Sequence, residues 1–300
     1  MDLSRALVVT KRSAFELYSS SPDQETREYA LKIQLLKESQ ETQQRSIETV
    51  LSALSRRGIT YDALQRQELD QRVNADPNFI ANYDLVIAVG GDGTFLEASH
   101  YVVDEIPLLG VNSDPQTSVG YFSMANSKTI DAMIDQLDTL PSTQLYRLQV
   151  EKIEDGERVS PSKQVLNDIL ICNVVPADMV RYTMTVDGEQ WQNKEGNSSL
   201  RSSGLLVCSA AGSTAWMYQC GGKVMPLGSR RMQFHEREQR NSGFHFAERE
   251  IIVESQTRGG IVYIDGGHLT EDFTLGSTIV ITPGTPLTVL GDLRAKRKKK

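Results

Sequence analysis

Residues 84–94 read Asp84-Leu-Val-Ile-Ala-Val-Gly-Gly-Asp-Gly-Thr94, an apolar run that breaks into glycines around a single carboxylate. The run is short and rich in β-branched residues, which predicts a strand buried on both faces of a parallel sheet. The glycines that follow allow a tight turn in which the backbone approaches a ligand where a Cβ would collide; they are Gly90, Gly91 and Gly93. Thr94 is predicted to cap a helix over residues 95–100, whose N-terminus would attract an anion.

Asp92, in the middle of this loop, is the chemically informative residue. A carboxylate beside bound phosphates would repel them, so affinity alone does not explain it. It is predicted to accept a proton or to partner a metal ion. The loop matches neither the Walker motif nor the spaced-glycine dinucleotide fingerprint. It therefore indicates a phosphoryl-transfer enzyme, with a plain strand-to-helix connection as the alternative.

The composition is that of an ordinary globular chain, and 300 residues are enough for two domains. No apolar run approaches ~20 residues, so no membrane span is expected. An odd count of three cysteines without a CxxC pair favours a reducing, cytoplasmic compartment. The net charge of −7 argues against nucleic acid as a partner, although six of the last seven residues are basic. Residues 294–300 are expected to form a solvated, disordered tail.

The first half of the chain alternates strand and helix signals. A strand is predicted at 6–10, and the polar segment 23–57 favours a helix that ends at Gly58 and carries an apolar stripe of Ile47, Val50, Leu51 and Leu54. A second buried strand is predicted at 107–112, followed by a helix that Asn126 or Ser127 caps and that ends near Pro141. Residues 59–83 show little pattern. This alternation predicts an α/β domain, a parallel sheet flanked by helices.

The pattern changes after Pro141 to short β-rich runs separated by Gly, Pro, Asp and Asn, which predicts a mainly antiparallel β domain. Residues 228–248 are charged and are expected to form an exposed excursion. We therefore assign residues 1–143 to the α/β domain and residues 144–275 to the β-rich domain. A return of residues 276–293 to the first domain stays open.

Three further segments carry polar side chains in unusual places. Asn112 ends a strand and is followed by Tyr121, which suits a ring-stacking wall, with a core role for the aromatic pair Tyr121-Phe122 equally open. Asn167 and Asp168 interrupt a hydrophobic run, so they must be paired internally or face a ligand such as ribose hydroxyls or adenine.

The third segment is Gly212-Ser213-Thr214-Ala215-Trp216, where a strand breaks into small residues. The small side chains leave room for a flat ligand beside exposed backbone. Ser213 and Thr214 supply hydroxyls, and Trp216 would close one side. Alone, this segment could be a structural turn.

Together these motifs resemble the NAD kinase family. Gly90–Thr94 is similar to the family's glycine-aspartate signature, and Gly212–Trp216 to its Gly-Ser-Thr-Ala-Tyr motif. Asn112–Phe122 is similar to the family's Asn…Gly-Phe segment, and Asn167-Asp168 to its Asn-Glu pair. Tyr263–Gly266 extends the likeness. Details such as Leu109–Asp114 look most like the plant-type NADH kinase branch.

The resemblance implies ATP-dependent phosphorylation of the adenosine 2′-hydroxyl of NADH or NAD, in a site formed by an α/β domain and a β-rich domain. It implies that Asp92 is the general base, that Asn167 and Asp168 hold ribose hydroxyls, and that Thr214 and Ala215 contact adenine. Mg²⁺ would arrive with ATP rather than through direct protein ligands. It also implies a homo-oligomer, a dimer or tetramer. The predicted substrate- and nucleotide-binding residues are Gly90, Gly91, Gly93, Thr94, Asn112, Tyr121, Asn167, Asp168, Ser203, Gly212, Ser213, Thr214, Ala215 and Trp216.

The chain departs from the family pattern at three positions. Asp168 stands where Glu is usual, and Trp216 replaces Tyr. Ser203 stands where many members carry an Asp placed toward the nicotinamide. Because only oxidised nicotinamide carries a positive charge, loss of that carboxylate predicts a shift of preference toward NADH.

Two other functions fit parts of the pattern. A lipid or sphingoid-base kinase shares a similar glycine-aspartate loop, but it would need an apolar acceptor channel. A non-catalytic dinucleotide sensor would gain nothing from the carboxylate of Asp92.

Overall fold

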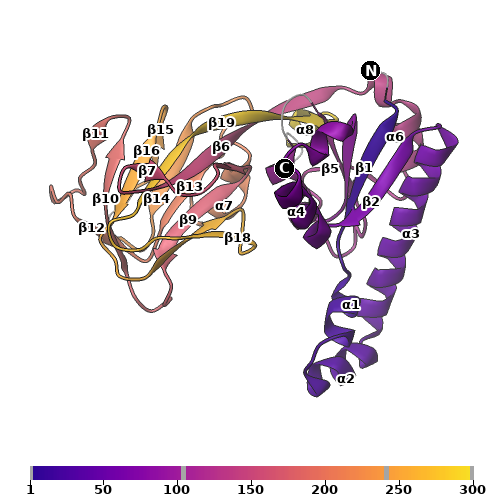
Figure 1. Cartoon of the computed structure of the whole chain (residues 1–300), viewed down its shortest axis with the longest axis horizontal. Coiled ribbons are helices and arrows are strands. Elements are labelled where there is room, and N and C mark those ends of the chain that lie inside the picture. Colours follow the sequence, from indigo (N-terminus) through magenta and orange to yellow (C-terminus); the bar gives the residue numbers. More distant parts are fainter. Residues whose placement is uncertain (1–2, 103–105, 240–242, 298–300) are drawn as a thin grey trace. The chain divides into compact units, whose positions relative to one another are not determined.

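The computed structural model describes residues 3–102, 106–239 and 243–297. They form two compact units, one of Met1–Thr143 with Leu287–Lys300 and one of Gln144–Pro286. Two long strands, β6 (Ser142–Glu154) and β19 (Thr278–Leu290), carry the chain from one unit to the other (Figure 1). Each unit has its own hydrophobic core.

A parallel sheet organises the first unit, with the strand order β2-β1-β3-β4. Its strands are β1 (Arg5–Thr10), β2 (Thr60–Gln65), β3 (Leu85–Gly90) and β4 (Leu108–Asn112). β5 (Ser123–Asn126) and the end of β19 also pair with β4 in parallel. Every residue of β3 and β4 is buried, as the apolar runs predicted. The glycine loop therefore leaves the carboxyl edge of a central strand.

Helices cover both faces of this sheet. α3 and α6 lie on one face and α4 lies on the other (Figure 1). α3 contacts α6, and α4 contacts α5. The helices of the unit are α1 (Ala14–Ser19), α2 (Gln24–Lys32), α3 (Gln34–Arg56), α4 (Arg66–Ala75), α5 (Asp92–Tyr101), α6 (Ile130–Asp135) and α8 (Leu293–Arg297), with 3₁₀ turns η1 (Phe79–Asn82) and η2 (Leu137–Thr139). No helix among the described residues is long and apolar enough to span a membrane.

Several predicted boundaries in this unit are wrong. The polar segment 23–57 forms two helices that meet at Ile33, because a single apolar stripe does not reveal a break between polar turns. Residues 59–83 are ordered as β2, α4 and η1, and β2, an edge strand, has no buried residue that would have marked it in the sequence. Asn126 belongs to β5 and does not cap a helix; α6 begins after Thr129.

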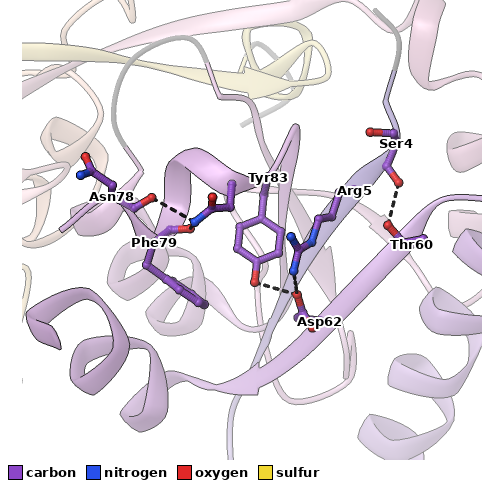
Figure 2. A network of polar contacts seen from close by, with 8 residues as sticks. Ser4, Arg5, Thr60, Asp62, Asn78, Phe79 and Tyr83 are labelled. Carbon is purple, nitrogen blue, oxygen red and sulfur yellow. Dashed lines mark hydrogen bonds and ion pairs between the residues drawn. The ribbon is translucent and has the colours of Figure 1, made fainter. Parts of the chain in front are cut away.

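Polar contacts join β1, β2 and the residue Tyr83, which precedes β3, at the amino edge of the sheet (Figure 2). Asp62 accepts hydrogen bonds from the Arg5 guanidinium and the Tyr83 hydroxyl, each at 2.8 Å. The pKa of Tyr83 is raised to about 12 by burial and by its bond to Asp62. Thr60 Oγ1 donates to the backbone carbonyl of Ser4 at 3.0 Å. Because the Arg5–Asp62 pair is about half exposed, it contributes at most ~1 kcal/mol.

The second unit is built from antiparallel strands. One six-stranded sheet has the order β15-β14-β13-β9-β17-β18. The other strands of the unit pair around β10, β16, β19 and β6. The bounds are β7 (Glu157–Arg158), β8 (Lys163–Val165), β9 (Asp168–Asn173), β10 (Val180–Val186), β11 (Glu189–Gln190), β12 (Leu200–Ser202), β13 (Leu205–Cys208), β14 (Met232–Glu236), β15 (His245–Ala247), β16 (Ile251–Ser255), β17 (Gly260–Ile264) and β18 (Leu269–Asp272), with η3 (Gly212–Thr214) and α7 (Trp216–Gln219).

Residues 228–248 do not form the exposed excursion that the sequence predicted. They contribute β14 and β15 to the six-stranded sheet, and Met232 and Phe234 are fully buried. Gln233 is buried as well, and its side-chain amide pairs with the backbone N–H and C=O of Lys223 at 2.8 Å each. A polar residue satisfied in this way hides the strand from a hydrophobicity pattern.

The end of the chain differs from the predicted disordered tail. Residues 294–297 are helical and belong to α8, which lies in the first unit. Residues 298–300 of the predicted tail lie outside the described part of the chain.

Candidate active site

The glycine loop forms the junction between β3 and α5. Gly91 occupies the N-cap position and Asp92 is the first helical residue, so Thr94 does not cap the helix. The Thr94 side chain is buried instead, and a Cβ at Gly90 would lie 2.2 Å from its Oγ1. Gly90 therefore has to be glycine for packing within the protein. A Cβ at Gly93 would meet nothing within 4 Å, so this side of the loop is open.

Asp92 is held by a backbone group from a distant loop. Its Oδ1 accepts a hydrogen bond from the N–H of Phe122 at 2.9 Å, while Oδ2 has no hydrogen-bond partner among the described residues. The helix N-terminus favours a negative charge at this position. The carboxylate is only partly buried. One oxygen is thus oriented by the protein, and the other is left for a ligand.

The aromatic pair after Gly120 divides into two roles. Phe122 is buried and stacks on Phe95 of α5, with ring centroids 5.0 Å apart. Its role is therefore the core role that the sequence left open. Tyr121 is only partly buried and meets the Phe122 ring edge-on at 5.1 Å. Its predicted contact with a ligand stays a prediction.

Asn112 lies beside the glycine loop, because it is the register partner of Gly90 in the parallel sheet. Its side chain is engaged within the protein. Nδ2 donates to the Ser118 carbonyl at 3.0 Å, and Oδ1 accepts from the Asp114 N–H at 3.1 Å. Asn112 therefore shapes the loop that leads to Tyr121.

In the second unit, Asp265 organises the Asn167-Asp168 pair. Its carboxylate accepts hydrogen bonds from the backbone N–H groups of Leu166, Asn167 and Asp168 at 2.7, 2.6 and 2.9 Å. Asp265 is buried and adopts a positive φ of 50° after β17. Asp265 lies in the Tyr263–Gly266 segment, but the sequence did not predict this role for it. The Asp-Gly-Gly turn after a strand was the available signal.

Burial changes the acid–base properties of this pair. The pKa of Asp168 is raised to about 7, first by burial and then by the negative charge of Asp265. Burial also raises the pKa of Asp265 to about 6, although its three backbone hydrogen bonds oppose the shift. Burial therefore favours the protonated form of both carboxyl groups.

The side chain of Asn167 is a strong indication of a ligand. Its Oδ1 is buried and has no hydrogen-bond partner among the described residues. A buried amide oxygen without a donor is costly, so a hydroxyl or amine of a bound molecule would stabilise it.

The Gly212–Trp216 segment packs directly on Asn167. The Ser209 N–H donates to the Asn167 carbonyl at 2.9 Å, and a Cβ at Gly212 would lie 2.0 Å from that oxygen. The structure therefore brings these two motifs together, and Gly212 is needed for their close approach.

The hydroxyls of this segment bond within the protein. Ser213 is fully buried; its Oγ donates to the Ala210 carbonyl and accepts from the Met225 N–H, each at 2.8 Å. Thr214 Oγ1 donates to the Ala211 carbonyl at 3.2 Å. Ala215 is partly exposed and Trp216 is 41% exposed. These internal hydrogen bonds fix the turn, so a ligand at Thr214 or Ala215 would contact a turn that is already in place.

Arg237 contacts both Ser203 and Trp216. The Ser203 N–H donates to the Arg237 carbonyl at 3.3 Å, and the Arg237 guanidinium carbon is 5.1 Å from the centre of the Trp216 ring. Arg237 also pairs with Glu238 at 3.6 Å. Arg237, whose carbonyl accepts this bond, directly follows β14 and directs its guanidinium over the Trp216 ring.

The predicted residues therefore form two groups. Gly90, Gly91, Asp92, Gly93, Thr94, Asn112 and Tyr121 belong to the first unit, and Asn167, Asp168, Ser203 and Gly212–Trp216 belong to the second.

The chain is similar to known kinases of NAD and NADH. Residues 3–140 match a family model described as the ATP-NAD kinase N-terminal domain. The chain is 33% identical over 273 residues to an NADH kinase of Arabidopsis thaliana, covering 78% of each chain. Its fold is similar to a yeast NADH kinase complexed with NADH, with a TM-score of 0.72, 14% identity, and coverage of 100% of this chain and 88% of that one. It is also similar to an Archaeoglobus fulgidus NAD kinase in complex with ATP, with a TM-score of 0.67, 20% identity, and coverage of 98% and 96%.

Proposed function

Because the chain belongs to the NAD kinase family, we propose that it transfers the γ-phosphoryl group of ATP to the adenosine 2′-hydroxyl of NADH or NAD. The products are ADP and NADPH or NADP. The observation that carries the proposal is the position of Asp92. It is the first residue of α5, just after a buried parallel strand, and one of its two carboxylate oxygens is held by the Phe122 N–H.

Asp92 acts as the general base. Its carboxylate takes the proton of the 2′-hydroxyl while the hydroxyl oxygen bonds to the γ-phosphorus. The bond from that phosphorus to the β,γ-bridging oxygen breaks, and ADP leaves with the electron pair. A positioned base of this kind typically contributes ~10²–10⁴-fold in rate. The backbone around Gly91 and Gly93 contacts the phosphates, where the lack of a Cβ leaves room.

The second unit binds the dinucleotide. Asn167 Oδ1, buried without a partner among the described residues, accepts a hydrogen bond from a ribose hydroxyl, and Asp168 contacts the same sugar. Thr214 and Ala215 contact adenine. In the first unit, Tyr121 provides a ring that can stack on a nucleotide. The Asp265 bonds to the backbone of 166–168 hold the ribose-binding pair in place.

Mg²⁺ accompanies ATP in this proposal. Among the described residues, no group of three or more His, Cys, Asp or Glu side chains could hold a metal ion. Mg²⁺ commonly keeps several waters and is held largely by substrate phosphates, so this proposal requires no direct protein ligand to the ion. When bound, Mg²⁺ offsets the charge of the phosphates beside Asp92.

NADH is the preferred acceptor in this proposal. Ser203 places no carboxylate at its position, so this position supplies no negative charge that would favour an oxidised, cationic nicotinamide. We further propose a cytoplasmic homo-oligomer, a dimer or tetramer. Three free cysteines support a reducing compartment, and sedimentation of the purified chain measures its assembly.

The test is an assay of the purified protein with Mg-ATP and either NADH or NAD, in which NADPH or NADP is measured. We expect turnover by the wild type and a loss of at least ~100-fold in kcat for Asp92→Asn. Asp135→Asn, which changes an exposed carboxylate on α6, is the matched control and should keep full activity. Turnover of a sphingoid base only, or dinucleotide binding without turnover, would overturn the proposal.

A further inference from the structure

We propose that Lys296, from the basic C-terminal segment, is a positioning residue for the catalytic carboxylate. It holds the loop 120–123, and that loop orients Asp92 through the Phe122 N–H. This inference rests on the proposed function of Asp92 as general base. All of these residues belong to the first unit.

Helix α8 is fixed to the body of the unit. Leu293 is 2% exposed, and its N–H donates to Thr143 Oγ1 at 3.2 Å. The same hydroxyl donates to the Gly291 carbonyl at 2.8 Å. Asp292 Oδ1 accepts from the Ala295 N–H at 3.0 Å, at the start of the helix. Lys296 therefore projects from an anchored turn rather than from a loose tail.

The Lys296 ammonium bonds to both ends of the loop. It donates to the Gly120 carbonyl and, at 2.6 Å, to the Ser123 carbonyl. The Ser123 N–H also donates to the Gly120 carbonyl at 3.1 Å, which closes a four-residue turn. An ammonium group has three donors, so it can hold two carbonyls at once.

The Phe122 N–H is not used within this turn and donates instead to Asp92 Oδ1. Hydrogen bonds to a charged group are stronger than neutral ones, so both the Lys296 contacts and the Phe122–Asp92 contact are of the stronger kind. The Phe122 ring also stacks on Phe95, which gives the loop a second attachment. Loss of Lys296 should therefore loosen the carboxylate without removing it.

The main variant is Lys296→Met, which keeps the aliphatic length and removes the donors. We expect kcat for NADH phosphorylation to fall about 10- to 100-fold, while the KM for ATP changes less than about threefold. The reason is that a misplaced base stabilises the transition state less but leaves ground-state binding of ATP unchanged. Lys296→Arg, which restores a cationic donor, should recover most of kcat. Arg294→Ala removes an exposed charge from the same helix and should change neither parameter.

A double-mutant cycle separates positioning from a general structural role. If Lys296 acts through Asp92, adding Lys296→Met to Asp92→Asn should cost almost no further kcat. A further loss as large as that in the wild-type background would overturn the inference.

The inference also fails if Lys296→Met retains kcat within twofold, or if its loss of kcat matches the fraction of protein unfolded at the assay temperature. The amide exchange of residues 118–126 provides an independent readout, and we expect faster exchange in Lys296→Met than in Arg294→Ala. Equal exchange in the two variants would contradict the proposed hold on the loop. A wild type without NADH or NAD turnover would instead refute the proposed function itself.

Discussion

Replacing the buried Asp168 by Asn should stabilise the protein most at alkaline pH. The folded-state pKa of Asp168 is about 7, raised first by burial and then by Asp265, against an ordinary value of 3.8. Between these two values the folded state holds a proton that the unfolded chain has released. The folded state therefore gains stability as the pH falls through about 7, and this gain is complete near 4.

The size of the effect follows from that difference in pKa. At pH 8 the folded wild type holds the ionised carboxylate, which lowers the free energy of unfolding by about 4 kcal/mol relative to a neutral side chain. At pH 5 the folded state must instead take up a proton that the unfolded chain lacks, which lowers the free energy of unfolding by less than about 2 kcal/mol. A neutral asparagine side chain at this position would carry no such cost at either pH. The difference in unfolding free energy between the variant and the wild type should therefore narrow by about 2–3 kcal/mol from pH 8 to pH 5.

Urea unfolding of both proteins at pH 5, 6.5 and 8 measures this difference directly. Asp135→Asn is the control, because Asp135 is exposed on α6 and should give a difference that stays flat with pH. A flat difference for Asp168→Asn, or one that widens on acidification, would refute the argument that Asp168 is buried at a cost.

Three further predictions concern side chains whose surroundings are equally specific. Gly212→Ala should lower the unfolding free energy by about 1–3 kcal/mol or more in a denaturant titration, because its Cβ would lie 2.0 Å from the Asn167 carbonyl oxygen; unchanged stability would contradict that contact. Gly93→Ala should keep or slightly raise stability, since a Cβ meets nothing within 4 Å and Ala favours a helix, yet it should raise the KM for ATP several-fold; full affinity would show that phosphates do not approach here. Ser203→Asp should shift the ratio of kcat/KM toward NAD by about fivefold or more, and an unchanged ratio would show that Ser203 does not set the preference.

The regular part of the fold was predictable because short stretches of neighbouring residues carry its pattern. The buried strands β3 and β4 follow from continuous apolar runs, and the change to short β runs after Pro141 predicts the antiparallel unit. The predictions failed where polarity and structure diverge. β2 is an edge strand without a buried face, and β14 carries a buried glutamine whose amide is satisfied by backbone.

The site was predictable to the extent that it lies in contiguous motifs. Gly90–Thr94, Asn167-Asp168 and Gly212–Trp216 were all identified from their own residues, but not the bonds that hold them. Thr94 was assigned a cap because a threonine near a helix start usually is one. Only the structure places it in the core, against Gly90.

The sequence by itself determined the kinds of group available: a carboxylate among glycines after a buried strand, an amide–carboxylate pair, and a small-residue turn. The tertiary structure alone decided which groups orient them. Asp92 is held from 30 residues away by Phe122, and the Asn167 backbone is held from 98 residues away by Asp265. Lys296 reaches Gly120 across 176 residues. A hydrogen bond between such distant residues depends on how the chain packs, and packing is a property of the whole core rather than of any local pattern.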